Sequence, residues 1–199
     1  MGTVTLTIQS KITPPGPSGK PFNTFYTCSR DSAQLCVLDP YSDEVSGKHL
    51  LVTGITLPLI ENGKTIAVLG LDISLGNFQQ NTVDDSHNLY DGKGEISILS
   101  PTGLIAGNSA SPMKLGNQLQ QVLPDNAREI LVALTQAKPL SLLDNQRITV
   151  LEPLETAAGS KPWGVLLSVP QNVLLAPVYA MQDALDAARL RSSALEFRV

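Results

Sequence analysis

Two carboxylates, Asp43 and Asp72, are the side chains of this sequence best suited to binding or chemistry. Asp72 lies in the apolar stretch AVLGLDISL, where an unpaired carboxylate would either destabilise the fold by several kcal/mol or take up a proton. A cationic ligand would supply the missing positive charge. Alternatively, two neighbouring carboxylates can act as an acid and base pair, as they do in sugar hydrolysis.

Each aspartate also has a simpler structural interpretation. Asp43 stands in the loop-like triplet Ser42-Asp43-Glu44, and an Asp in a turn commonly bonds its own backbone. Asp72 could cap a helical turn that begins at Leu75. From the residues alone, both alternatives stay open.

Other catalytic and metal-binding patterns are weak, so we do not expect an enzyme. The sequence contains no Gly-x-Ser-x-Gly elbow, no phosphate-cradling loop and no His-Glu-x-x-His run. His49 and His87 have no partners at metal-ligand spacing, and we expect both at the surface. We therefore expect no metal and no cofactor.

The two aspartates flank a predicted β-hairpin. His49–Ile60 and Thr65–Ser74 are rich in Val, Ile, Leu and Thr, and Glu61-Asn62-Gly63 between them has the composition of a turn. We expect this hairpin to carry both carboxylates to one end of a sheet.

The overall composition excludes some classes of function. In 199 residues, hydrophobic residues make up 42% and charged residues 16%, which is enough for a packed core. The formal net charge of -4 leaves no basic surface for nucleic acid. A membrane-spanning helix needs about 18 or more uninterrupted apolar residues. The longest candidate stretch, Trp163–Met181, is interrupted by Pro170 and Pro177.

Cys28 and Cys36 lie eight positions apart in a segment rich in Ser, Arg and Asp, which we expect to be a loop. In an oxidising compartment they would form one disulfide that stabilises the fold by ~2 to 3 kcal/mol on the entropic model. The alternative is two free thiols in a reducing compartment. A zinc site is not expected, because no His lies nearby.

Further elements are predicted on either side of the hairpin. Alternation at Thr3–Ile8 predicts a strand, and the segment from Pro14 to Pro21 predicts a loop. Leu75–Gln80 resembles a short helical turn, and Asn81–Gly94 a polar connector between two modules. The second half of the chain predicts an antiparallel sheet with helices on one side. We expect a helix at Asn126–Gln136, capped by Asp125, and Trp163 in the core. The predicted strands are Glu95–Leu99, Leu104–Ala106, Arg147–Leu154 and Trp163–Val169.

The last stretch, Asn172–Glu196, predicts a helix. Its apolar residues recur at helical spacing, at Leu174, Val178, Met181, Leu185 and Ala188. Because Pro177 suits a first helical position, we expect the regular helix to start near Ala176. The simplest interpretation is an amphipathic helix packed on the domain.

Residues in and around the hairpin form an ordered string, namely Pro40-Tyr41, Gly47, Thr53, Pro58, Asn62-Gly63-Lys64 and Gly70-Leu71-Asp72-Ile73-Ser74-Leu75. This string is similar to the membrane-distal half of a double Cache sensor domain. Such domains are the extracytoplasmic ligand-binding part of bacterial chemoreceptors, and of some sensor kinases and cyclic-dinucleotide enzymes.

The resemblance implies an α+β fold of two stacked, PAS-like Cache modules. Each module would be an antiparallel sheet flanked by helices. Residues 1–82 would form the membrane-distal module, without the long helix that normally precedes it in the family. Residues 83–170 would form the membrane-proximal module, and residues 171–199 a C-terminal helix that leads toward a membrane span.

The resemblance also implies a ligand site. Family members that bind amino acids hold the ligand amine with two Asp residues, which correspond here to Asp43 and Asp72, with Tyr41 beside them. Thr53 belongs to the same implied set. An Arg-x-Trp-Tyr box, whose Arg and aromatic residues grip the ligand carboxylate, corresponds here to Asn23-Thr24-Phe25-Tyr26.

The departure at Asn23 decides the expected ligand. Phe25 and Tyr26 keep the aromatic wall, but a neutral amide cannot replace a guanidinium fork. The remaining set of two aspartates and aromatic faces suits an organic cation, such as a polyamine, histamine or another biogenic amine. Arg30 offers an alternative, since it could swing back and restore a carboxylate site.

The expected function is therefore the sensor domain of a bacterial chemoreceptor, at the periplasmic face of the inner membrane. It would bind a small amine and signal through the terminal helix, as a homodimer in the full-length receptor, with contact to the membrane only through segments outside this chain. Alternatives are a sensor of amino acids, purines or organic acids, a domain of a histidine kinase or diguanylate cyclase, or a free periplasmic binding protein.

Overall fold

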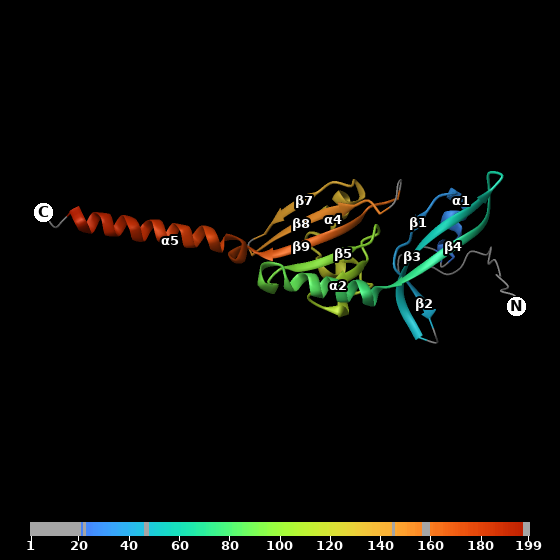
Figure 1. Cartoon of the computed structure of the whole chain (residues 1–199), viewed down its shortest axis with the longest axis horizontal. Helices are drawn as coiled ribbons and strands as arrows, with labels where there is room; N and C mark the ends of the chain where they lie inside the picture. The colour runs from blue at the N-terminus through green and yellow to red at the C-terminus, as the bar shows by residue number, and fades with distance from the viewer. Residues whose placement is uncertain (1–20, 22, 46–47, 145, 157–159, 197–199) are drawn as a thin grey trace.

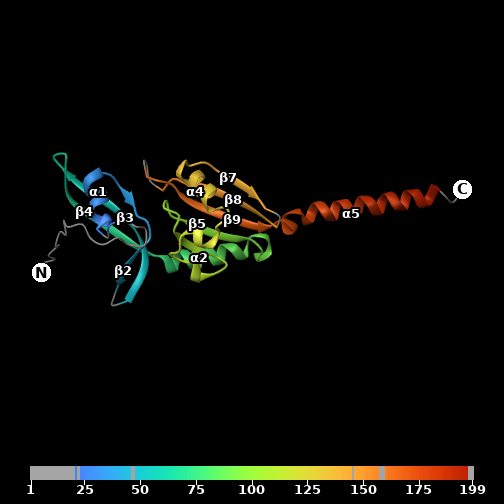
Figure 2. The ribbon, with the colours of Figure 1, turned by 180° about the vertical axis from the view of Figure 1, so that it is seen from behind.

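The computed structural model describes residues 21, 23–45, 48–144, 146–156 and 160–196, with the backbone alone at 43–45, 48–49 and 191–196. Two antiparallel sheets follow one another along the long axis of the molecule, and the last helix extends beyond the second sheet (Figures 1 and 2). The expected strand at Thr3–Ile8 and almost all of the expected Pro-rich loop lie outside the described residues.

We refer to the first sheet with the helix packed on it as the distal module, and to the second sheet with its helices as the proximal module. The main feature of the distal module is the predicted hairpin. The strands β3 (Lys48–Glu61) and β4 (Lys64–Ser74) confirm that prediction to within a residue or so at each end. Asn62 and Gly63 connect them with positive φ values of 50° and 74°. A two-residue type I′ turn requires positive φ at both positions, and Asn-Gly is its preferred sequence.

The second edge of β3 pairs with two short strands, β2 (Tyr41–Val45) and β1 (Cys36–Val37). The residues between them, Leu38–Pro40, belong to neither strand. β1 and β2 therefore form one edge with an interruption, at which the chain can turn toward the second sheet.

The segment that holds both cysteines is not the loop that its composition predicts. Cys28 lies in helix α1 (Thr24–Ser32), and Cys36 begins β1. The helix ends at Ala33, which has a left-handed conformation with a φ of 53°. Polar residues such as these have weak helix propensity, so packing of the helix on the sheet has to supply its stability.

The face of the β3–β4 hairpin that points away from α1 carries exposed leucines. Leu57, Leu69 and Leu71 have exposed fractions of 44%, 63% and 63%. Side chains alternate between the two faces of a strand, so these leucines lie opposite the face that carries Gly54 and Thr56.

The second sheet belongs to the proximal module and has the strand order β6-β5-β9-β8-β7. The four predicted strands are confirmed, and β7 is an additional one, because four residues of sequence are too few to show a period. The strands are β5 (Glu95–Leu99), β6 (Ile105–Asn108), β7 (Leu140–Leu143), β8 (Arg147–Leu154) and β9 (Trp163–Pro170).

Helices cover both faces of the proximal sheet, so the expectation of helices on one side is wrong. On one face, α4 (Ala127–Thr135) buries Ile130 and Leu134 in the main core. On the other face, α2 (Leu75–His87) packs beside β5 and β6.

Asn126, and not Asp125, is the N-cap residue of α4. Shorter helical turns lie at Tyr90–Gly92 (η1), Pro112–Lys114 (η2) and Leu119–Val122 (α3).

Helix α2 is twice as long as the predicted turn and replaces the first half of the expected polar connector. It runs through residues 82 and 83, the proposed boundary between the modules. Its buried face includes Thr82 and Ser86, whose hydroxyls donate to the backbone oxygens of Phe78 and Val83 at 2.6 and 2.8 Å. Buried hydroxyls that bond their own helix pack like small apolar groups, which is why a hydrophobic pattern does not reveal this helix.

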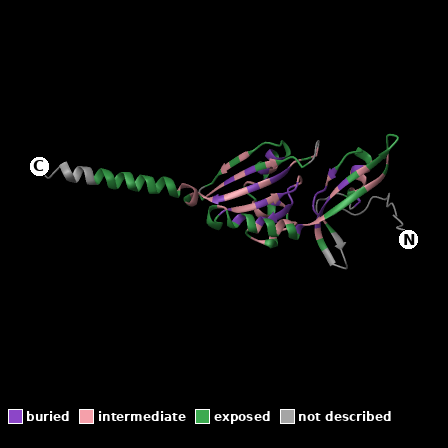
Figure 3. Ribbon diagram, viewed as in Figure 1, coloured by how far each residue is buried: buried purple, intermediate pink, exposed green. Residues whose placement is uncertain are grey.

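The C-terminal helix α5 (Gln171–Glu196) projects from the end of β9 and is exposed along most of its described length (Figure 3). From Ala176 to Leu190 its residues are exposed, so this part of the helix is not packed on the domain, contrary to the simplest interpretation of the sequence. The helix begins at Gln171 and continues through Pro177, so the predicted start near Ala176 is also wrong. Within the described residues, no helix has both the length and the hydropathy needed to cross a lipid bilayer.

Candidate ligand-binding site

Tyr41 and Asp72 meet across the central strand of the distal sheet. The Tyr41 hydroxyl donates a hydrogen bond to Oδ1 of Asp72, although the two residues are 31 positions apart. Tyr41 pairs with Val52 on one edge of β3, and Asp72 pairs with Gly54 on the other. The contact therefore passes over Gly54, and it presents a carboxylate and a phenol at an exposed position.

Gly54 makes this contact possible, although it is not among the site residues predicted from the sequence. A Cβ atom at position 54 would lie 3.0 Å from Oδ1 of Asp72 and 3.1 Å from the Tyr41 hydroxyl. A side chain there would push the two groups apart. The signal in the sequence was a glycine inside the apolar strand LLVTGITL, since such a glycine often marks a close approach of other groups.

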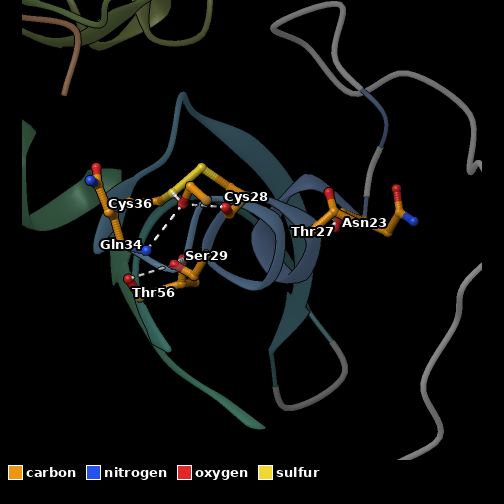
Figure 4. Close-up of a disulfide and its surroundings, with 8 residues drawn as sticks. Asn23, Thr27, Cys28, Ser29, Gln34, Cys36 and Thr56 are labelled. Carbon is orange, nitrogen blue, oxygen red and sulfur yellow. Dashed lines mark hydrogen bonds between the residues drawn. A yellow bond between two sulfur atoms is a disulfide. The ribbon is translucent and has the colours of Figure 1, made fainter. Parts of the chain in front are cut away.

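Helix α1 covers the same face of the sheet. The buried Ser29 hydroxyl lies 2.7 Å from the Thr56 hydroxyl and donates to the Thr56 backbone oxygen at 2.9 Å (Figure 4). Thr56 is two residues from Gly54, so both residues face α1. The Thr65 hydroxyl on β4 donates to the backbone oxygen of Arg30 at 3.2 Å.

The disulfide between Cys28 and Cys36 joins α1 to β1. It lies beside the Ser29 contact, as Figure 4 shows. Together, the covalent bond and the Ser29 hydrogen bonds fix α1 against the edge of the sheet nearest to Tyr41.

The residues of the expected aromatic box lie at the start of α1. Asn23 is the N-cap residue, 6% exposed, and its backbone oxygen accepts from the amides of Tyr26 and Thr27, both at 3.0 Å. Phe25 is 40% exposed, and Tyr26 is half-buried. The residue at the family's Arg position therefore begins a helix, and the aromatic residues follow in its first turn.

Arg30 is held by its own neighbour. Its guanidinium forms a two-point ion pair with Asp31, at 2.6 and 3.0 Å, and lies 5.3 Å from the centroid of the Tyr26 ring. The hydrogen bond between the two side chains raises the pKa of Arg30 and lowers the pKa of Asp31. A ligand carboxylate that binds Arg30 has to compete with Asp31.

The other two expected site residues lie away from the Tyr41–Asp72 contact. Thr53 is 2% exposed and its hydroxyl donates to the backbone oxygen of Leu38 at 2.6 Å. Asp43 of β2 pairs with Leu50 of β3, but the Asp43 side chain is not among the described ones. Leu50 is four β3 positions from Gly54, or about 13 Å along the strand. The joint binding of one ligand by both aspartates stays a prediction.

A second polar cluster, in the proximal module, is structural. Glu95 on β5 accepts from the Lys114 ammonium at 2.8 Å and from the Asn108 amide at 2.9 Å. Partial burial of Glu95 acts to raise its pKa, but these hydrogen bonds outweigh burial and hold the pKa of Glu95 below its usual range. Its carboxylate is thus already paired within the protein. No cluster of potential metal ligands occurs among the described residues.

Comparison with known proteins connects this arrangement to bacterial sensors. No family model matches the chain. A curated relative, the methyl-accepting chemotaxis protein TlpQ of Pseudomonas aeruginosa, is 45% identical over 191 residues, which is 95% of this chain and 27% of the relative. The chain therefore spans about a quarter of that protein's length.

Solved sensor domains share the fold over most of this chain. The periplasmic sensory domain of the Campylobacter jejuni chemoreceptor Tlp1 has a TM-score of 0.59 at 15% identity, over 72% of this chain and 52% of its own. The extracellular domain of the putative histidine kinase mmHK1S-Z3 has a TM-score of 0.62 at 17% identity, over 79% and 56%. The ligand-binding domain of the Pseudomonas aeruginosa amino acid chemoreceptor PctC, in complex with GABA, has a TM-score of 0.55 at 19% identity, over 76% and 63%. These likenesses confirm the predicted class of two antiparallel sheets flanked by helices.

Proposed function

We propose that this chain is a Cache-type sensor domain of the kind found in bacterial chemoreceptors, and that its distal module binds a small organic amine, such as a polyamine or histamine. The observation that carries the proposal is the contact of Tyr41 with the exposed Asp72 above Gly54. An exposed carboxylate attracts a cation, and the phenol beside it can donate or accept as the ligand requires.

Helix α1, which packs on the same face of the sheet as this contact, also supports a cationic ligand. Tyr26 already lies beneath a guanidinium, so its ring can stabilise a positive charge. The family's carboxylate anchor is replaced by Asn23, which is buried at the start of a helix. A ligand with an amine and no carboxylate fits this set best.

The expected affinity is in the micromolar range. Each charge-assisted hydrogen bond contributes about 1.5 to 3 kcal/mol. Three such bonds, together with an aromatic contact, approach the about 8 kcal/mol of a micromolar complex. Asp43, about four strand positions away, is proposed to contact the second amine of a longer polyamine.

An amino acid is the second candidate, and Arg30 is the observation that favours it. The solved PctC domain was obtained with GABA, which carries both an amine and a carboxylate. Arg30 would bind that carboxylate if its pairing with Asp31 were broken. An organic acid would require the same rearrangement.

We propose that the full-length protein is a chemoreceptor whose sensor domain lies at the periplasmic face of the inner membrane. The disulfide fits an oxidising compartment. A free periplasmic binding protein is less favoured, because the relative matched over 95% of the chain is a methyl-accepting chemotaxis protein. A histidine kinase or diguanylate cyclase would use the same sensor, and the sequence that follows Val199 in the gene distinguishes these outputs.

A homodimer in the membrane is part of this proposal. The spacing Leu174, Val178, Met181, Leu185 and Ala188 alternates steps of four and three, as in the seam of a two-stranded coiled coil. Val178, Met181 and Leu185 are 58%, 66% and 52% exposed, so a second α5 can cover them.

Titration calorimetry with putrescine, spermidine, histamine and a set of amino acids tests the ligand. We expect micromolar binding of at least one amine, and a loss of more than about tenfold in affinity for Asp72→Asn, which removes the negative charge of the site. Asp186→Asn is the matched control, because Asp186 is exposed on α5, away from both sheets.

The outcomes separate the candidates. Binding of amines that is unchanged in Asp72→Asn contradicts the assignment of Asp72. Binding of amino acids alone, abolished by Arg30→Ala, would establish the second candidate instead.

A further inference from the structure

The two modules share a small apolar cluster at their junction. The distal sheet contributes Val37 and Leu51, and helix α2 contributes Leu75 and Phe78. The proximal sheet contributes Ile98, Ala106 and Trp163. Trp163 is 5% exposed, its ring stacks at 6.3 Å from that of Phe78, and its indole N–H has no hydrogen-bond partner among the described residues.

A buried carboxylate also crosses this junction. Asp39 lies in the interruption between β1 and β2 and is 5% exposed. Its Oδ1 accepts from the hydroxyl of Thr102 at 2.8 Å and from the backbone amide of Thr102 at 3.2 Å. Thr102 belongs to the turn between β5 and β6, so a side chain of the distal module is held by the proximal module.

The same short segment carries Tyr41 of the candidate site. Leu38 is fixed to β3, because its amide donates to the Gly54 backbone oxygen at 2.8 Å and its oxygen accepts from Thr53. Pro40 is buried, and its ring limits rotation of the backbone. One stiff segment therefore makes two side-chain contacts. Asp39 binds Thr102 of the proximal module, and Tyr41 binds Asp72 of the distal sheet.

We propose that Asp39 is a positioning residue that couples the Tyr41–Asp72 site to the proximal module through Thr102. A ligand amine that binds Asp72 competes with the Tyr41 hydroxyl for the carboxylate. Release of the Tyr41 side chain removes the attachment of the segment to Asp72, while the Tyr41 backbone stays paired with Val52, and the Asp39–Thr102 contact weakens. The ligand part of this inference rests on the proposed function, whereas the coupling between Tyr41 and Thr102 is a property of the fold.

Amide hydrogen exchange tests the coupling without any ligand. Tyr41→Phe removes the bond to Asp72, and we expect the Thr102 amide to exchange about fivefold faster, the effect of losing one hydrogen bond of ordinary strength. The amide of Ile130, bonded to Asn126 in α4, is the internal reference for global unfolding. Tyr179→Phe, on α5, is the matched control. Exchange at Thr102 that is unchanged relative to Ile130 overturns the proposal.

Fluorescence of Trp163 tests the ligand step, because it is the one tryptophan in the sequence. We expect histamine or putrescine to change its emission in the unmodified protein and in Thr102→Ser, which keeps the hydroxyl. In Thr102→Val the emission change should be lost, while calorimetry shows an affinity within about threefold of the unmodified protein, since Thr102 lies outside the site.

The two experiments fail separately. If neither amine binds the unmodified protein, the proposed function is wrong, and the exchange rate of Thr102 still decides the coupling. If the amine binds and Thr102→Val keeps the full emission change, the coupling through Asp39 and Thr102 is wrong.

Discussion

Gly54 controls the candidate site although it has no functional group of its own. A Cβ atom at this position would lie 3.0 Å from Oδ1 of Asp72 and 3.1 Å from the Tyr41 hydroxyl, which is closer than ordinary van der Waals contact. The glycine is needed for space rather than for an unusual backbone angle. An added methyl group should therefore disturb the site more than the strand.

Gly54→Ala tests this role. We expect at least a tenfold loss of amine affinity, because the methyl group separates Tyr41 from Asp72, and little change in secondary structure. Calorimetry and circular dichroism are the measurements. Gly70→Ala is the matched control in the same hairpin, since its Cβ would meet only Thr56, at 3.7 Å. Equal losses in the two variants would contradict the role given to Gly54.

At the scale of the elements, α1 is the part of the distal module most dependent on long-range contacts. Its sequence is polar, and Ser29 is its one buried residue. The disulfide joins Cys28 in α1 to Cys36 in β1, and a cross-link over so short a loop stabilises mainly by limiting the unfolded chain. The proposed aromatic wall of the site, Phe25 and Tyr26, lies in this helix, so the order of the proposed site should depend on the disulfide.

Reduction of the disulfide tests this link. We expect the free energy of unfolding to fall by about 2 to 3 kcal/mol on reduction, and amine affinity to fall with it as α1 loosens. Denaturant unfolding and calorimetry, with and without a reductant, are the measurements. The double variant Cys28→Ser, Cys36→Ser should match the reduced protein and show no response to the reductant. Unchanged affinity in the reduced protein would show that α1 is not part of the site.

For the whole molecule, α5 is the element that can carry a signal away from the two sheets. It leaves the proximal module at the end of β9 and is exposed along most of its described length (Figure 3). Its apolar residues Val178, Met181 and Leu185 are exposed to solvent. A helix with an exposed apolar stripe gains stability when a second copy covers it. The partner proposed above is the same helix of a second receptor subunit.

Cysteine cross-linking in a longer receptor that carries this domain, embedded in membranes, tests the pairing of α5. Met181→Cys places a thiol in the proposed seam, and we expect oxidation to yield disulfide-linked dimers. Asp183→Cys, on the opposite side of the helix, is the control and should cross-link at least about fivefold less. Both cysteines of the sequence are already joined in the domain, so each variant adds a new free thiol. Equal cross-linking at the two positions would contradict the seam.

The sequence by itself determined the elements whose pattern is local. Runs rich in Val, Ile, Leu and Thr, with an Asn-Gly turn between them, predicted the hairpin of β3 and β4, and similar runs predicted β5, β8 and β9. Strand propensity and turn chemistry act within a few residues, so neither signal needs the rest of the fold. The family resemblance predicted the class of sensor and a ligand site that includes Tyr41 and Asp72.

Only the tertiary structure decided which groups meet. The contact of Tyr41 with Asp72 depends on the register of three strands, and the contact of Asp39 with Thr102 on the packing of two modules. Helix α1 forms because a disulfide and the Ser29 hydroxyl hold a sequence with a weak helical pattern against the sheet, and helix α2 forms because Leu75 and Phe78 pack against its neighbours. Such contacts join residues far apart in the chain, and a one-residue change of register would replace all of them, so a local pattern cannot contain them.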